Sequence, residues 1–336
     1  MSREPGGPDA GSPDAGSPDA RLRLREVFGL DPLWPGLRDC LRAVVGGGGL
    51  PPTRFGLSSL RIFKPWISLP AWLGRARRDG RVPIYNFVNR KAPPPGRPYS
   101  VRVTDCEDFQ GGRWTYDGHV GTDLALPVGT AITAAAPGHV LRVRNDMNRG
   151  GLKVFIDHGG GLITSSNHLA RALVREGDAV RRGQVIALSG MSSVDGLLFF
   201  PWLAPHLHFN VFLDGRPVDP FARPDETPLW RDGDAPRPAV RDSTEALPAR
   251  TQWSEEGVKA ALEACRDPEL RDRIAVLPRE EQAIELFIAQ NFFSPLFDAW
   301  PALVAESRAR EPWLELPVGE SVGGRPCLGV ALPPQG

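Results

Sequence analysis

The histidines of this chain are concentrated in one part of the sequence. All six lie between residues 119 and 208, at His119, His139, His158, His168, His206 and His208. A single histidine is usually a structural residue, so this concentration predicts chemistry only if several imidazoles converge. Imidazole nitrogens together with carboxylate oxygens form a ligand set that binds zinc. The first question is therefore which of these side chains can reach a common point.

His206 and His208, separated by Leu207, are the first pair of histidines predicted to lie together. In an extended strand, successive side chains alternate between the two faces, so both imidazoles share one face. Leu207 and the apolar residues at 209 and 211 take the other face. Two imidazoles would then lie on a polar face above an apolar floor. Considered alone, the segment could also be an exposed strand edge.

His119 and Asp123 form a second pair and lie four residues apart, which gives them the same side of an extended chain. Gly121 and Pro127 argue against a helix at this point. Considered alone, the pair could be hydrogen-bonded at the surface. Together, the two pairs favour a metal site in which three protein ligands leave one position open, as in catalytic zinc sites.

Spacing does not assign the remaining three histidines to the site. His139 follows a Pro-Gly pair and His158 precedes three glycines, and these turn contexts favour structural or exposed roles. The spacing leaves the role of His168 undecided.

The elements that would position these residues are predicted to be β-strands. Between residues 99 and 221, short β-branched and apolar stretches alternate with Gly, Asn and Asp, which is typical of an antiparallel β domain. The clearest stretches are 131–143, 153–156, 184–188 and 207–213.

The flanks of this domain predict linkers and helices. Residues 6–20 repeat a five-residue unit without large apolar side chains, which predicts a disordered tail over 1–20. Residues 21–98 form an N-terminal helical and wrapping extension, with an amphipathic helix between Asp31 and Gly49. A linker at 222–250 precedes a helical C-terminal region, 251–336, with helices starting at Asp267 and Pro278. The predicted fold class is α+β, a central antiparallel sheet with mainly helical extensions.

Composition excludes several classes of protein. Forty basic and forty acidic residues give a formal net charge of zero, and the lack of an overall basic field argues against nucleic-acid binding. No apolar run approaches the roughly 18 residues of a transmembrane span. The four cysteines are far apart and form no CxxC, which argues against a thiolate zinc site or a dense disulfide framework. The first thirty residues show no secretory signal pattern.

The motifs of the β domain resemble those of a known family, the lysostaphin or LytM family of zinc metalloendopeptidases. Their order and spacing both match, over about residues 113–220. The matching segments are 118–125 (GHVGTDLA), 127–130 (PVGT), 134–135 (AA), 167–169 (NHL), 174–180 (VREGDAV), 183–187 (GQVIA), 205–209 (PHLHF) and 217–220 (PVDP).

The resemblance implies a groove on an antiparallel sheet in which His119, Asp123 and His208 hold Zn²⁺. It also implies that His168 and His206 are catalytic histidines that do not bind the metal. Zinc lowers the pKa of a water ligand from near 15.7 toward about 7 and polarises a carbonyl group. No HExxH segment is present to supply a glutamate base. Proton transfer is therefore expected to fall to imidazoles, whose ordinary pKa is near 6.5.

The resemblance further implies a substrate, the peptide stems of bacterial peptidoglycan, cut at glycyl-glycine or D-alanyl cross-links. This substrate implies a periplasmic or extracellular location, although no signal peptide is visible. The sequence predicts no oligomeric state.

Two departures from the family pattern affect details of the site. Ser166 stands where the family often has a tyrosine, two residues before His168, which predicts the loss of one substrate or oxyanion contact. An apolar insertion at 197–203 replaces a short Gly/Ser-rich loop, and could be a groove wall, a lid or a flap packed on a flanking helix, the last being favoured. A further hypothesis is that Asn86 or Asn89 folds back as a fourth zinc ligand, as occluding asparagines do in some latent relatives.

Three other functions compete with the peptidase. The first is a non-catalytic, cell-wall-binding regulator of other wall hydrolases, but all five expected site positions are present, which favours an enzyme. The second is a lipoyl or biotinyl carrier, which needs a lysine at a hairpin tip. None of the four lysines has that setting, namely Lys64, Lys91, Lys153 and Lys259. The third is a generic metal-binding scaffold, which would cleave no peptide.

Overall fold

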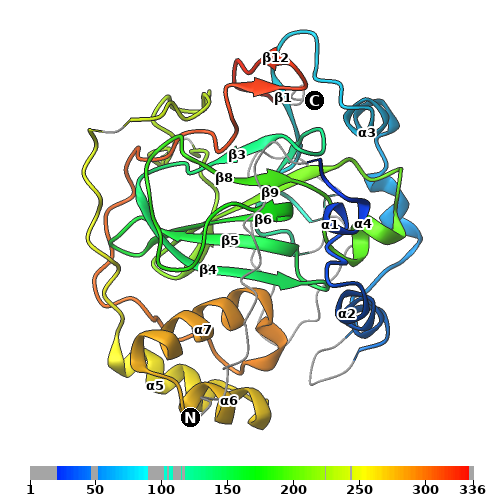
Figure 1. Ribbon diagram of the computed structural model, residues 1–336. Coiled ribbons are helices and arrows are strands. Elements are labelled where there is room, and N and C mark those ends of the chain that lie inside the picture. The colour runs from blue at the N-terminus through cyan, green and yellow to red at the C-terminus, as the bar shows by residue number, and fades with distance from the viewer. Residues whose placement is uncertain are drawn as a thin grey trace, which may run out of the picture.

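The computed structural model describes residues 21–46, 52–89, 102–103, 106–108, 115, 118–223, 225–242 and 244–332. Within these residues, one 11-stranded sheet forms the centre of the protein and helices lie along its sides (Figure 1). The fold is α+β, as predicted. The strands of this sheet are β1 (Val82–Asn86), β2 (Thr122–Ala125), β3 (Ala131–Thr133), β4 (Gly138–Asp146), β5 (Gly151–Asp157), β6 (Leu162–Ala172), β7 (Ala179–Val180), β8 (Val185–Ser189), β9 (His206–Leu213), β10 (Arg216–Val218) and β13 (Val330–Ala331).

The central part of the sheet is antiparallel, which confirms the prediction for this segment. Strands β2, β9, β6, β5 and β4 follow one another, and each pairs antiparallel with its neighbour. All four stretches predicted from the sequence contribute strands. The sheet also extends beyond these stretches, because β1 pairs with β2 and β13 runs parallel to β1. The N- and C-terminal extensions therefore each contribute a strand to this sheet.

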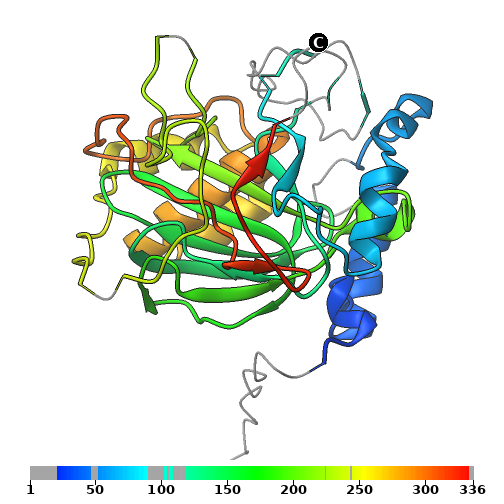
Figure 2. The same ribbon diagram turned by 90° about the horizontal axis from the view of Figure 1, so that it is seen from above.

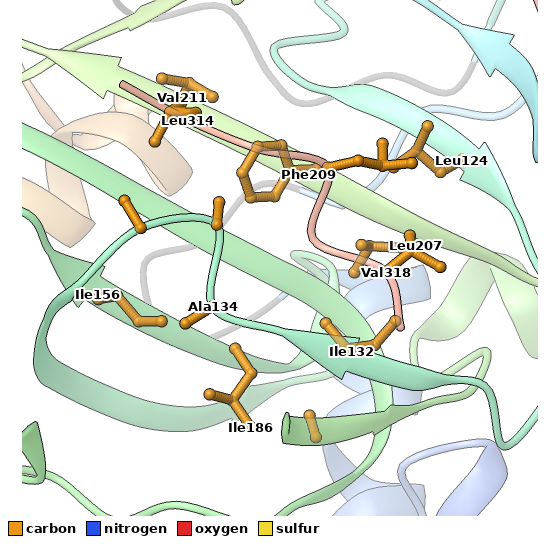
Figure 3. Packing of buried hydrophobic residues seen from close by; sticks show 14 of the residues in the cluster. Leu124, Ile132, Ala134, Ile156, Ile186, Leu207, Phe209, Val211, Leu314 and Val318 are labelled. Atoms are coloured by element: carbon orange, nitrogen blue, oxygen red, sulfur yellow. The ribbon is translucent and has the colours of Figure 1, made fainter. Parts of the chain in front are cut away.

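The main core lies under one face of β9. Leu207, Phe209 and Val211 alternate with the histidines along this strand and are buried, which confirms the predicted alternation. Neighbouring strands and a C-terminal segment complete the cluster, as Figure 3 shows, with Leu124, Ile132, Ala134, Ile156, Ile186, Leu314 and Val318. The apolar floor of the site is thus part of the largest core of the protein.

Three C-terminal helices pack on the other face of the sheet: α5 (Glu255–Ala264), α6 (Pro268–Ala275) and α7 (Arg279–Phe292). The two predicted helix starts are confirmed. The Asp267 side chain accepts a hydrogen bond from the Leu270 N–H at 2.9 Å, with Pro268 at the first helical position. Helix α7 begins directly after Pro278.

The rest of the C-terminal region differs from the helical prediction. After η2 (Ser294–Leu296), residues 297–332 run mostly without helix and include a hairpin of β11 (Ser321–Val322) and β12 (Arg325–Pro326). Leu314, Leu316 and Val318 are all buried, and their spacing of two is that of an extended chain packed on a sheet. Pro312 and Pro317 would also disrupt a helix here.

The N-terminal extension forms a layer along one side of the sheet (Figure 2). It contains α1 (Leu24–Val27), α2 (Leu33–Val45), η1 (Leu57–Ile62) and α3 (Pro65–Trp72), and α4 (Val194–Leu198) lies beside it. Helix α2 confirms the helix predicted between Asp31 and Gly49 and ends at Gly46, whose φ is +82°. The tail predicted at 1–20 lies outside the described residues. No helix in the described part of the chain is long and apolar enough to cross a bilayer.

Phe287 of α7 is the side chain expected to fix the C-terminal helices on the sheet. It is fully buried, and its ring lies edge-on to Phe212 at 5.0 Å and Phe155 at 6.4 Å. Phe287→Ala is expected to lower the free energy of unfolding by about 3–5 kcal/mol, measured in urea. Val276→Ala, at an exposed position, should change it by less than about 0.5 kcal/mol. Equal unfolding midpoints for the two variants would contradict this prediction.

Candidate metal centre

Three of the side chains singled out from the sequence converge at β2 and β9. The possible ligand atoms of His119, Asp123 and His208 all lie within 4.8 Å of one another. Asp123 is paired directly with His208 across the two strands. Its Oδ1 lies 2.7 Å from His208 Nδ1, and its Oδ2 lies 3.0 Å from His119 Nε2. One carboxylate therefore faces two imidazoles, one through each oxygen.

The surrounding backbone fixes which nitrogen each imidazole presents. His119 Nδ1 donates a hydrogen bond to the Phe87 carbonyl at 2.8 Å, so Nε2 is the nitrogen that faces Asp123. His208 Nε2 lies against Gly121, where a Cβ atom would be only 2.6 Å from it. Only glycine fits at position 121 without displacing this ring, and His208 presents Nδ1 to the cluster.

His168 and His206 lie beside this group. Their ring centroids are 4.6 Å apart, and His168 is 5.9 Å from His208. Each Nδ1 donates to a main-chain carbonyl, His168 to Ser192 at 2.9 Å and His206 to Ala204 at 2.8 Å. Both rings therefore offer Nε2 for proton transfer, and His206 Nε2 is 3.6 Å from Asp123 Oδ1. The structure thus brings together all five residues that were predicted for the site.

The backbone of His168 explains why spacing could not place this residue. Its φ is +61°, in the left-handed region that non-glycine residues rarely adopt. The pairing of β5 with β6 shifts register between Ser166 and Leu169, so His168 lies in a β-bulge. Its N–H donates to the Gly150 carbonyl at 2.8 Å, which helps to hold this conformation. Strained residues of this kind often occur in active sites.

Burial and mutual charge set the protonation of the cluster. Burial would raise the pKa of Asp123, but the imidazoles of His119, His206 and His208 outweigh it and hold that pKa well below the ordinary value. Burial lowers the pKa of His168 well below the ordinary value, and His206 and His208 lower it further. Burial also lowers the pKa of His208, although Asp123 opposes the shift. At neutral pH, Asp123 is therefore ionised, and His168 and His208 are neutral.

Strand β1 covers the site from the N-terminal extension. The Asn86 side chain donates through Nδ2 to Asp123 Oδ2 at 2.8 Å. The amide thus turns its nitrogen, which is a hydrogen-bond donor, toward the ligand carboxylate. Asn89 instead accepts a hydrogen bond from Thr115 Oγ1 at 3.1 Å. Of the two asparagines considered as a fourth ligand, Asn86 is the one whose side chain is shown hydrogen-bonded to Asp123, while the Asn89 N–H donates to the His119 carbonyl at 2.9 Å.

Three further polar residues near the site carry no recognisable sequence signal. The Tyr85 ring stacks on His206, with centroids 6.2 Å apart. Lys64 Nζ donates to the Tyr85 carbonyl at 2.9 Å, and burial lowers its pKa. Burial also raises the pKa of Asp195, against the effect of His206. Tertiary packing alone brings Lys64 and Tyr85 to the site, because they come from the segment predicted as a wrapping extension.

The apolar insertion packs on the N-terminal extension, which agrees with the flap interpretation. Phe199 contacts Phe63 edge-on at 5.6 Å, and Phe200 contacts Trp72 at 4.9 Å. The Trp72 indole donates to the Leu203 carbonyl at 2.9 Å. The carbonyls that orient His168 and His206 belong to residues 192 and 204, on either side of this insertion. The packed insertion therefore also supports the two histidines.

His139 and His158 lie outside the cluster, in line with the structural roles favoured by their turn contexts. His139 Nε2 lies 3.2 Å from the Pro248 carbonyl. His158 is buried, donates through Nδ1 to the Pro137 carbonyl and accepts through Nε2 from Thr164 Oγ1, both at 2.9 Å. Burial lowers the pKa of His158 to about 4.

This shifted pKa predicts a loss of stability in mild acid. Between about pH 6.5 and 4, the unfolded chain protonates His158 while the folded chain does not, so the free energy of unfolding falls as the pH falls. The full loss is expected to reach about 3 kcal/mol. Urea unfolding at pH 7 and pH 4.5 should show a larger drop for the wild type than for His158→Gln. Equal drops would contradict the assignment.

The donor set of the cluster suits a transition metal. Two imidazole nitrogens and one carboxylate oxygen are the ligands that zinc binds in three-ligand catalytic sites. Their buried setting and mutual contacts make His119, Asp123 and His208 a group that could hold a metal ion.

The segment that holds this cluster also matches a known protein family. Residues 117–220 match the family model of Peptidase family M23. Peptidoglycan DD-endopeptidase ShyA of Vibrio cholerae is 40% identical over 102 residues, which cover 30% of this chain and 22% of ShyA. The Lipoprotein NlpD/LppB homolog of Pseudomonas aeruginosa is 33% identical over 111 residues, which cover 32% of this chain and 35% of that protein.

A solved structure gives a similar match. The structure of LytU is 32% identical and covers 31% of this chain and 71% of LytU, with a TM-score of 0.27. The chain spans only about a fifth of the length of ShyA. Residues 117–220 are therefore identified as an M23 peptidase domain within this chain.

Proposed function

We propose that this chain is a zinc-dependent endopeptidase that hydrolyses peptide cross-links of bacterial peptidoglycan. The observation that carries the proposal is the convergence of His119, Asp123 and His208 with the two further histidines, His168 and His206. Membership of a peptidase family supports the reaction class. The names of the DD-endopeptidase relatives support the substrate class.

In this proposal, His119 holds the zinc ion through Nε2, Asp123 through its carboxylate and His208 through Nδ1. When bound, zinc supplies a Lewis acid that lowers the pKa of water and polarises the peptide carbonyl. Asp123 is ionised and His208 is neutral at pH 7, so both are in the state that metal binding requires. Asn86 fixes the orientation of Asp123 by donating to Oδ2.

His168 and His206 handle the protons. Because each Nδ1 is engaged with a main-chain carbonyl, each ring can take up or release a proton only at Nε2. His168 is neutral at pH 7, so its Nε2 accepts a hydrogen bond or a proton from the attacking water. His206 lies beside His168, and its Nε2 is 3.6 Å from Asp123 Oδ1. The pair can therefore transfer a proton from water to the leaving amine.

Digestion of purified sacculi tests the proposal. Zinc-loaded wild-type protein is expected to release new amine ends, and a chelator should suppress the release. No new amine ends from zinc-loaded protein would contradict it. A non-catalytic regulator would give that negative result and would increase the release produced by another wall hydrolase. The complete set of five site residues is the observation that favours the enzyme over the regulator.

A further inference from the structure

Helix α2 exposes the face that an amphipathic helix ordinarily buries. Its buried residues are Gly36 and Ala43, both small. Its large apolar side chains recur at helical spacing and are exposed, with Trp34 at 79% and Leu41 at 63%. The exposed set is Leu33, Trp34, Leu37, Leu41, Val44 and Val45. A surface helix usually turns such a stripe toward the core, but within the described residues this stripe is exposed.

The exposed apolar surface continues onto the neighbouring elements. On α3, Trp66 is 71% exposed and Leu69 is also exposed, as is Leu73 directly after the helix. In the insertion, the exposed apolar residues are Leu198, Phe200 and Trp202. Helix α2 contacts α4, and Phe200 contacts Trp72 of α3. Figures 1 and 2 show α2, α3 and α4 along the same side of the protein. We call the exposed apolar residues of α2, α3 and 198–202 the apolar face.

The segment that builds most of this face is strongly basic. Residues 21–89 contain twelve Arg and Lys residues and four Asp and Glu residues, a net charge of +8 in a chain whose total is zero. Exposed arginines lie on α2 itself, at Arg38 and Arg42. Others line a cavity of about 250 Å³ beside α3, at Arg75, Arg78 and Arg81. The neutral total therefore hides a net charge of +8 in the segment that carries most of the apolar face, although Arg38 and Arg42 share an ion pair with Asp39.

We propose that the apolar face is a docking surface for an anionic lipid bilayer. Helices that lie on membranes combine Leu, Phe and Trp on one side with Lys and Arg around them, and each basic residue near an anionic surface adds to the attraction. Exposed tryptophans at three separate elements are typical of residues at the level of lipid headgroups. A second copy of this chain is a poorer occupant, because it would oppose one +8 segment to another.

Docking of the apolar face would also set how far the candidate metal centre lies from the lipid surface. Beneath the apolar face, Phe199 and Trp72 belong to a buried cluster that includes Tyr85. Tyr85 in turn stacks on His206. These contacts connect the apolar face to the candidate metal centre, so a docked protein would hold that centre near the lipid surface.

Vesicle flotation of the full chain tests this proposal. We expect the protein to float with phosphatidylcholine vesicles that contain phosphatidylglycerol, to float poorly with pure phosphatidylcholine, and to bind less as salt increases. The double variant Trp34→Glu with Leu41→Glu should lower the partition coefficient by at least about 100-fold, at roughly tenfold for each lost apolar contact. Val276→Glu, at an 82% exposed position on the C-terminal helices, is the matched control and should bind like the wild type.

Circular dichroism and thermal unfolding verify that the variants remain folded, as expected at exposed positions. The proposal is overturned if the wild type does not bind phosphatidylglycerol vesicles, or if the double variant binds as well as the control. Light scattering separates a second outcome. In that outcome, the wild type forms dimers that the double variant does not form, and binds no vesicles. That result would assign the face to a second copy of the chain and would also overturn the proposal.

Discussion

Replacing His208 by alanine is expected to abolish zinc binding and hydrolysis together. The substitution removes Nδ1, one of three donors that lie within 4.8 Å of one another, and leaves His119 and Asp123 as a two-ligand remnant. Zinc sites of this type use at least three protein ligands. Zinc content after dialysis should fall from about one ion per chain to less than about a tenth, and sacculus digestion should fall by at least roughly a thousandfold.

His139→Ala is the matched control for this experiment. It also removes an imidazole from the central sheet, but its Nε2 lies near the Pro248 carbonyl, away from the cluster. We expect His139→Ala to retain zinc and activity. If His208→Ala instead kept a full equivalent of zinc, the assignment of this residue as a ligand would be wrong.

The part of the site that could be predicted from the sequence rests on local geometry. Alternation along a strand is a property of neighbouring residues, so it correctly separated His206 and His208 from Leu207. The pairing of Asp123 with His208 is different, because 85 residues separate them and only the sheet register joins them. Alternation placed each pair on one face, and the convergence of the two pairs was predicted from their combination and from the order of motifs in the family resemblance.

The parts that could not be predicted depend on tertiary structure. His168 lies in a β-bulge with positive φ, where the alternation of side chains breaks down. Strand β1 carries Tyr85 and Asn86 to the site, but its sequence includes Pro83 and gives no sign of the partner strand that it joins. Whether a short apolar segment becomes a strand depends on a free edge elsewhere in the fold.

Helix α2 shows that a periodic pattern predicts a helix without predicting which of its faces is buried. Its periodicity predicts an amphipathic helix, and the helix is present. The pattern does not state which face packs on the protein, and here the small residues Gly36 and Ala43 do so. Likewise, the total charge of zero argues against a basic field, yet it conceals the charge of residues 21–89. Local charge and exposure are therefore better guides to a partner than totals for the whole chain.

His168→Ala and His206→Ala are expected to separate catalysis from metal binding. Neither residue belongs to the three-donor cluster, so zinc content should stay near that of the wild type. Each variant loses an Nε2 that faces the site, and removing a residue that transfers protons costs about 10²–10⁴-fold in rate. The loss should appear in kcat, with KM for a soluble cross-linked peptide little changed, because the imidazoles act on protons and do not anchor the peptide chain.

The His168 variant also tests the protonation state of His168 that follows from its burial. His168 is surrounded by two imidazoles and buried, so it is neutral over the whole neutral range and its removal should leave the acid limb of the pH–rate profile nearly in place. His206 Nε2 lies 3.6 Å from Asp123 Oδ1, and its removal should lower the rate. Wild-type turnover in either variant, with zinc still bound and the His139→Ala control unchanged, would show that the histidine concerned has no catalytic role.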